Sequence, residues 1–111
     1  MTTYYVIDTN ITKEVIEQLA TEGANFITLQ SIKDEILRYR EDALKKLIEA
    51  LETNGRLEIK EDEQFKQEFT DDRLIQLCKQ LQGEEQIIEL LTNDILVHLK
   101  AQHNGINAAT A

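Results

Sequence analysis

The chain has 111 residues, a formal net charge of −9 and one cysteine, Cys78. This length suits a single domain, one cysteine excludes an internal disulfide and a cysteine-rich zinc cluster, and no apolar run approaches the ~20 residues of a membrane-spanning helix. The acidic balance argues against holding nucleic acid by a basic surface alone, although metal ions bound to carboxylates reverse the local field. We expect one cytoplasmic domain over residues 1–111, complete or cut from a longer protein, without membrane contact.

The first part of the chain predicts a strand, a helix and a second strand. Residues 4–7 form a short, β-branched apolar run that is typical of a buried strand, and the small polar residues Asp8-Thr9-Asn10 end it. Apolar residues at helical spacing over 11–19 predict a helix, and residues 26–29 predict the next strand. A carboxylate at the carboxyl end of a buried strand lies where open α/β sheets keep their ligand sites, although turn and cap chemistry explains the same residues.

The next segment predicts a helix with a weak middle. Ser31 and Asp34 form a start that resembles a capping box. Residues 38–42 are polar and are expected to bend or interrupt the helix before the apolar pattern resumes over 44–51. A short third strand is predicted at 57–59.

The second half begins with a charged connector over 60–69, which has no clear period and is expected to be a loop or a loose helical turn. Thr70 or Asp71 is expected to cap a helix whose buried face lies within 74–81. An apolar strand at 87–91 then runs into Thr92-Asn93-Asp94 and a short helix.

The end of the chain is less regular. Ile106 is expected to enter a final edge strand, and the small residues 108–111 are expected to be disordered unless a longer protein was cut there. Strands and helices alternate throughout, which predicts the α/β class: a three-layer α/β/α domain around a parallel sheet of four to five strands.

Carboxylates occupy corresponding positions at several of these junctions. Asp8 and Asp94 each stand where an apolar strand leads into a helix, so a parallel sheet places both on one edge. Glu35 lies in the first turns of the helix after the second strand, and Asp71 lies at the start of the helix before the last strand run. Clustered carboxylates repel one another unless a cation or proton intervenes, and hard oxygen ligands favour Mg²⁺ or Mn²⁺ over zinc. The helix dipole, which favours acids in first turns, explains each acid singly.

Four segments, in order and over nearly the whole chain, resemble the motifs of the PIN-domain nucleases. They are 5–10 (YVIDTN), 31–36 (SIKDEI), 70–75 (TDDRLI) and 90–94 (LLTND), the last followed by Lys100-Ala101 and Gly105-Ile106. The first ends a strand in Asp-Thr-Asn, and the second places a glutamate before an aliphatic residue early in a helix. The third opens a helix with an aspartate, and the fourth ends an aliphatic strand in Thr-x-Asp. The resemblance is nearest to PIN domains of RNA decay and processing proteins and of PhoH-type fusions.

This resemblance implies a PIN-like sheet in the order 3-2-1-4-5 and an acidic site for Mg²⁺ or Mn²⁺. The catalytic and metal-binding residues that it implies are Asp8, Glu35, Asp71 and Asp94. Asn10 and Thr92 would be supporting residues that orient the aspartates or the attacking water. Asp72 remains the alternative to Asp71, or reaches the metal through a water molecule.

Two basic residues in the motif segments, Arg73 and Lys100, are weaker candidates for substrate contact. The resemblance departs from the family after Asp94, where Ile95 and Leu96 replace the polar and basic pair of many relatives.

The leading hypothesis is a metal-dependent endoribonuclease, a hydrolase in which carboxylate-bound Mg²⁺ or Mn²⁺ activates water for attack on single-stranded RNA. The alternatives are a binding or assembly module that keeps the fold with weak or no nuclease activity, and the toxin of a toxin–antitoxin pair. The expected partners are RNA and, besides it, a second copy of the chain or a protein partner, either an antitoxin or a fused domain.

Overall fold

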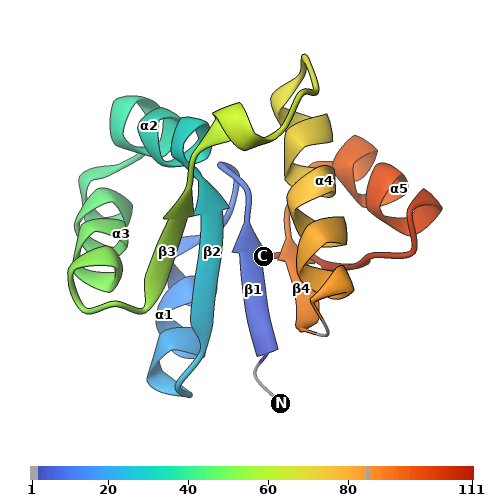
Figure 1. The fold of residues 1–111 in the computed structure, drawn as a ribbon. Coiled ribbons are helices and arrows are strands. Elements are labelled where there is room, and N and C mark those ends of the chain that lie inside the picture. Colours follow the sequence, from blue (N-terminus) through green and yellow to red (C-terminus); the bar gives the residue numbers. More distant parts are fainter. Residues whose placement is uncertain (1–2, 85) are drawn as a thin grey trace.

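The computed structural model describes residues 3–84 and 86–111, which form a parallel β-sheet flanked by helices (Figure 1). The elements in chain order are β1 (Thr3–Ile7), α1 (Lys13–Thr21), β2 (Asn25–Leu29), α2 (Gln30–Tyr39), α3 (Asp42–Thr53), β3 (Leu57–Lys60), the 3-10 turn η1 (Asp62–Gln64), α4 (Thr70–Gly83), β4 (Ile87–Leu91), α5 (Ile95–His103) and β5 (Asn107–Ala109). The sheet order is β3-β2-β1-β4-β5 and every neighbouring pair is parallel. The predicted fold class and strand order are therefore confirmed. Within the described ranges, no helix has both the length and the apolar character needed to span a membrane.

Strand β1 lies in the middle of the sheet, between β2 and β4, and is covered on both faces. Val6 and Ile7 both have 0% of their surface exposed. Because neighbouring residues of a strand point to opposite faces of the sheet, this burial requires a packed layer on each side. Helix α4 lies in front of the strands and α1 behind them in the view of Figure 1. The continuous apolar runs of the central strands are typical of such doubly covered parallel sheets.

The helical segment after β2 differs from the prediction at its start. Helix α2 begins at Gln30, and its flanking residue Leu29 has no side chain that can cap it. The Ser31 hydroxyl donates instead to Asp62, so the predicted capping box is wrong: a carboxylate from a distant loop satisfies this helix end. The predicted interruption is confirmed, because α2 ends at Tyr39 and α3 begins at Asp42.

Two further local predictions are corrected. Thr70 and Asp71 lie inside the first turn of α4, and the residue at its N-cap is Phe69, so neither residue is the cap. The tail is not disordered, because β5 pairs with β4 and Ala111 is only 5% exposed. The Ala111 N–H donates to Asn93 Oδ1 at 3.0 Å and its carbonyl accepts from the Thr12 N–H at 2.6 Å. Backbone hydrogen bonds to distant segments therefore order a tail whose own side chains are small.

Thr28 offers a test of which hydrogen bonds stabilise the carboxyl ends of the strands next to Asp8. Its side chain is fully buried, and its hydroxyl donates to the Ile7 carbonyl at 2.7 Å, one residue before Asp8. Thr28→Val keeps the β-branched shape but removes this donor, so the free energy of unfolding is expected to fall by about 1–2 kcal/mol. Urea denaturation measures the change, and Thr28→Ser, which keeps the hydroxyl, is the matched control. A Thr28→Val protein as stable as the wild type would show that this hydrogen bond does not stabilise the edge.

Candidate active site

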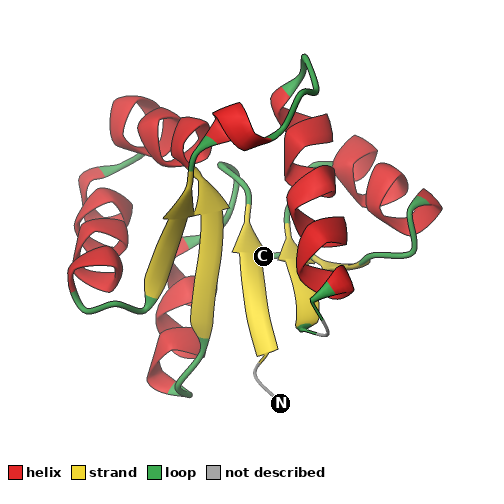
Figure 2. Cartoon of the chain, in the orientation of Figure 1, coloured by secondary structure: helices red, strands yellow, loops and turns green. Residues whose placement is uncertain are grey.

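The loops that follow β1 and β4 meet at one edge of the sheet. The two strands are paired in parallel up to Ile7 and Leu91, and the Asp8 N–H donates to the Leu91 carbonyl at 3.1 Å. The arrowheads of the strands in Figure 2 point to this same edge. The structure therefore brings together the two strand ends at which the sequence places Asp8 and Asp94.

Asp8 is 5% exposed, and its carboxylate is held at both oxygens. Its Oδ1 accepts from the Thr9 N–H at 2.7 Å, and its Oδ2 accepts from the Thr92 hydroxyl at 2.8 Å. The Thr92 hydroxyl in turn accepts from the Asp94 N–H at 3.1 Å. One buried hydroxyl thus links the two aspartate loops. A carboxylate has about four acceptor positions, so two donors fix Asp8 without exhausting its capacity to bind a cation.

Asn10 ties the same two loops together through a reciprocal pair with Asn93. Asn10 Oδ1 accepts from the Asn93 N–H at 2.7 Å, and Asn93 Nδ2 donates to the Asn10 carbonyl at 2.8 Å. Asn10 and Thr92 therefore both act on the geometry of the loops that carry the aspartates, which is the structural part of the supporting role that the sequence predicts for them.

Two further side chains contact the loops at this edge, and no sequence motif predicts these contacts. His98 Nε2 lies 2.6 Å from the Thr92 carbonyl. Because a carbonyl only accepts, the ring carries a proton at Nε2 when it makes this bond. The Arg40 guanidinium donates to the Thr9 carbonyl from the end of α2 and also pairs with Glu41. Each contact joins a helical segment to a loop at the sheet edge, so the spacing of residues in the sequence does not predict it.

Asp71, the second residue of α4, is electrostatically coupled to the strand-end aspartates. Burial raises the pKa of its carboxyl, and the negative charge of Asp8 raises it further, with Asp94 acting in the same direction and Lys100 opposing. The carboxylates at the ends of β1 and β4 therefore lie within electrostatic range of the one at the start of α4.

The neighbouring Asp72 has a different partner. It accepts a hydrogen bond from Lys100 Nζ at 3.0 Å, and this bond raises the pKa of Lys100. Asp72 is thus paired with a cation of the protein, whereas the nearby carboxylates of Asp8 and Asp94 act on Asp71.

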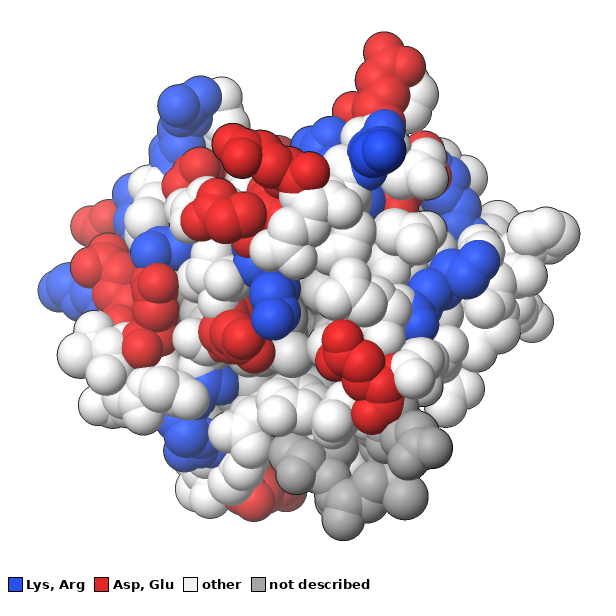
Figure 3. Space-filling view, viewed as in Figure 1, with Lys and Arg blue, Asp and Glu red and all other residues white. Residues whose placement is uncertain are grey.

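The remaining predicted residues stand farther from this convergence. Glu35 is exposed on α2, beside Ser31 and Arg38, and within the described ranges no hydrogen bond or ion pair joins it to the three aspartates. Arg73 is engaged by Asp62, as Lys100 is by Asp72, so substrate contact by these two basic residues stays a prediction. On the face shown in Figure 3, acidic and basic side chains are interspersed and form no continuous basic surface.

The donor set fits a hard cation. Among residues 3–84 and 86–111, no three His, Cys, Asp or Glu side chains stand close enough together to enclose a metal ion. Mg²⁺ retains several waters and usually takes only one or two carboxylates from the protein, rather than a dedicated cage. Converging but separate aspartates, with oxygen as their only ligand atom, match that mode of binding.

Comparison with known proteins finds matches to a family model and to solved structures. A family model described as PIN domain matches residues 5–111. Among solved structures, a PilT N-terminus domain protein from the hyperthermophilic archaeon Sulfolobus solfataricus P2 aligns with a TM-score of 0.66 at 16% sequence identity, covering 96% of this chain and 86% of that chain. At this identity the structural likeness shows the fold. A comparison with curated proteins finds no match.

Proposed function

The chain belongs to the PIN-domain family, and from this premise we propose that it is a metal-dependent endoribonuclease that cleaves single-stranded RNA. PIN domains are generally nucleases and generally use divalent metal ions. The observation that carries the proposal is that Asp8 and Asp94, at adjoining strand ends, lie within electrostatic range of Asp71, whose pKa is raised first by burial and then by their negative charges. Asp94 also caps α5 by accepting from the Leu96 N–H at 2.9 Å, but like charges near one another at the carboxyl edge of a parallel sheet are also an arrangement that a bound cation would relieve.

The proposed roles follow from these positions. Asp8, Asp71 and Asp94 would hold one or two Mg²⁺ or Mn²⁺ ions, and Glu35 would complete a second site or orient the attacking water. A bound ion of this kind supplies a nucleophilic water at neutral pH and stabilises the charge of the phosphate. Thr92 and Asn10 keep the Asp8 and Asp94 loops in register through the hydrogen bonds described above.

Dependence on divalent metal tests the proposal directly. Cleavage of a single-stranded RNA is expected to stop in excess chelator and to return when Mg²⁺ or Mn²⁺ is restored, because the ion lowers the pKa of the attacking water and stabilises the charge of the phosphate. Gel analysis of end-labelled RNA measures this, and circular RNA separates endonuclease from exonuclease activity. A duplex of the same sequence is the matched substrate control. Cleavage that persists in chelator would contradict the metal assignment.

A binding or assembly module with weak or no nuclease activity is the second candidate, and one observation favours it. Ile95, Leu96 and Leu99 on α5 are 72%, 63% and 55% exposed. Exposed apolar side chains gathered on one helix are typical of surfaces that contact another protein. Light scattering of the purified chain and the cleavage assay above separate the two candidates, because a module of this kind assembles but does not turn over RNA.

A further inference from the structure

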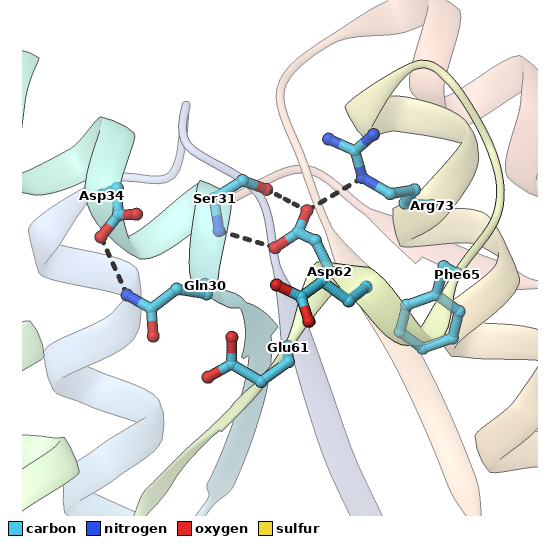
Figure 4. Close-up of a pocket in the computed structure, with 8 residues that line it drawn as sticks. Gln30, Ser31, Asp34, Glu61, Asp62, Phe65 and Arg73 are labelled. Atoms are coloured by element: carbon cyan, nitrogen blue, oxygen red, sulfur yellow. Dashed lines mark hydrogen bonds and ion pairs between the residues drawn. The ribbon is translucent and has the colours of Figure 1, made fainter.

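Asp62 joins two helices through a single carboxylate (Figure 4). Its Oδ1 accepts from the Ser31 N–H at 2.9 Å, and its Oδ2 accepts from the Ser31 hydroxyl and from Arg73 Nε, the latter at 2.9 Å. Ser31 lies in the first turn of α2 and Arg73 in the first turn of α4. We call Ser31, Asp62 and Arg73 the carboxylate clasp.

Arg73 extends the clasp over the start of α4. Its NH1 donates to the carbonyls of Gln67 and Glu68 at 3.1 Å and 2.9 Å, and its NH2 donates to Thr70 Oγ1 at 3.0 Å. One guanidinium therefore binds the loop before α4 and the first residue of the helix. Asp71 is the next residue along the chain. A planar guanidinium fork is suited to fixing several acceptors in one geometry.

The clasp also reaches the helix that carries Glu35. Ser31 and Glu35 are four residues apart in α2, so they lie on the same face about one turn from each other. Asp8 and Asp94 stand at strand ends that Thr92 links, whereas Asp71 and Glu35 stand in the first turns of two helices, α4 after the connector that follows η1 and α2 directly after β2. Asp62 connects these two helices at the ends nearest the acids.

The charge of Asp62 is maintained by its partners. Burial raises the pKa of its carboxyl, but the hydrogen bonds from Ser31 and the ion pair with Arg73 outweigh burial and hold the pKa below its usual value. Hydrogen bonds in which one group is ionised are stronger than neutral ones, so the clasp has the strength to set the relative placement of the two helix ends.

We propose that Asp62 and Arg73 are positioning residues for the metal site, which fix the helix starts that carry Asp71 and Glu35 relative to each other. This inference rests on the proposed metal-dependent function. It assigns Arg73 to the protein's own architecture rather than to substrate contact, and it gives a role to Asp62, which the motif segments do not include.

Manganese affinity of the full chain tests the clasp. Asp62→Asn is expected to weaken Mn²⁺ binding about tenfold, the order seen when supporting partners of metal ligands are removed. Ser31→Ala, which removes only the hydroxyl donor, should weaken it less and provides a folded variant if Asp62→Asn does not fold. Glu63→Gln is the matched control, because it removes the same charge from an exposed neighbour in η1 and should leave Mn²⁺ affinity unchanged. The free Mn²⁺ signal in electron paramagnetic resonance gives the dissociation constants.

The double variant Asp62→Asn with Arg73→Gln separates positioning from general loss of stability. Because the two residues share one contact, the fold-changes in Mn²⁺ affinity should not multiply. A lower melting temperature with unchanged Mn²⁺ affinity in Asp62→Asn would overturn the positioning role and leave the proposed function standing. Wild-type protein that binds no Mn²⁺ would overturn the metal site, and the positioning role with it.

Discussion

Asp8→Asn is expected to lower the rate of RNA cleavage by about 10³-fold, the order found when a charge-stabilising group is removed from an active site. Asparagine has nearly the same shape, and its amide oxygen still accepts a hydrogen bond from the Thr9 N–H or the Thr92 hydroxyl. It loses the negative charge and one of the two ligand oxygens. The measurement is kcat/KM on single-stranded RNA in Mn²⁺.

The fold of the Asp8→Asn protein is expected to survive. The carboxylate is almost fully buried, so neutralising it removes a desolvation cost rather than an essential ion pair. Circular dichroism and a cooperative thermal melt verify this. Asp34→Asn is the control, because Asp34 is an exposed acid on α2 whose side chain contacts Gln30. Full activity in Asp8→Asn would remove Asp8 from the site.

The sequence predicts most of the sheet because the central strands are encoded locally. Residues 4–7 and 87–91 are mostly apolar runs, and both become strands that pair with each other in parallel. The junctions after them are also local, since a strand end and the next helix start are separated by a few polar residues. For this reason the sequence alone assigns Asp8 and Asp94 to one edge of the sheet.

The carboxylate clasp could not be predicted in this way. Asp62 lies in a charged connector without periodicity, and its partner Ser31 is 31 residues away in the chain. The capping-box prediction at Ser31 failed for the same reason. A charged carboxylate that approaches through the tertiary structure competes for the free N–H groups of a helix end and displaces the local acid.

The tail was mispredicted because its order comes from backbone pairing. Ala108 and Ala109 have little side chain to bury, and composition alone therefore suggested disorder. Their register opposite Leu90 and Leu91 gives each residue a place in the sheet. Amino-acid composition indicates only which side chains are present. An edge strand such as β5 is held mainly by backbone N–H and C=O groups, which do not depend on the side chain.

Asp71→Asn and Asp72→Asn are expected to differ greatly in their effect on RNA cleavage, although the two residues are adjacent. Asp71→Asn should lower RNA cleavage by about 10²–10³-fold, because Asp71 is the carboxylate that faces Asp8 and Asp94. Asp72→Asn removes only the partner of Lys100 and should change cleavage by a few-fold. Parallel kcat/KM values on the same RNA compare the pair. If Asp72→Asn proves the more damaging, the ligand assignment moves to Asp72.

The melting temperature of the metal-free protein tests independently whether the Asp71 carboxylate destabilises the fold when it is charged. Its pKa is raised in the folded protein, so the folded state binds this proton more tightly than the unfolded chain does. Its contribution to stability is therefore present below the unfolded pKa and is lost as the pH rises through the folded pKa. Asp71→Asn should melt at a higher temperature than the wild type at neutral pH, and this gain should shrink as the pH falls through that window. Adding Mn²⁺ should reverse the order, because the ion stabilises only the protein that binds it. A metal-free Asp71→Asn protein no more stable than the wild type would mean that neither burial nor the charges of Asp8 and Asp94 raise the pKa of Asp71, and the electrostatic coupling on which the metal site depends would be absent.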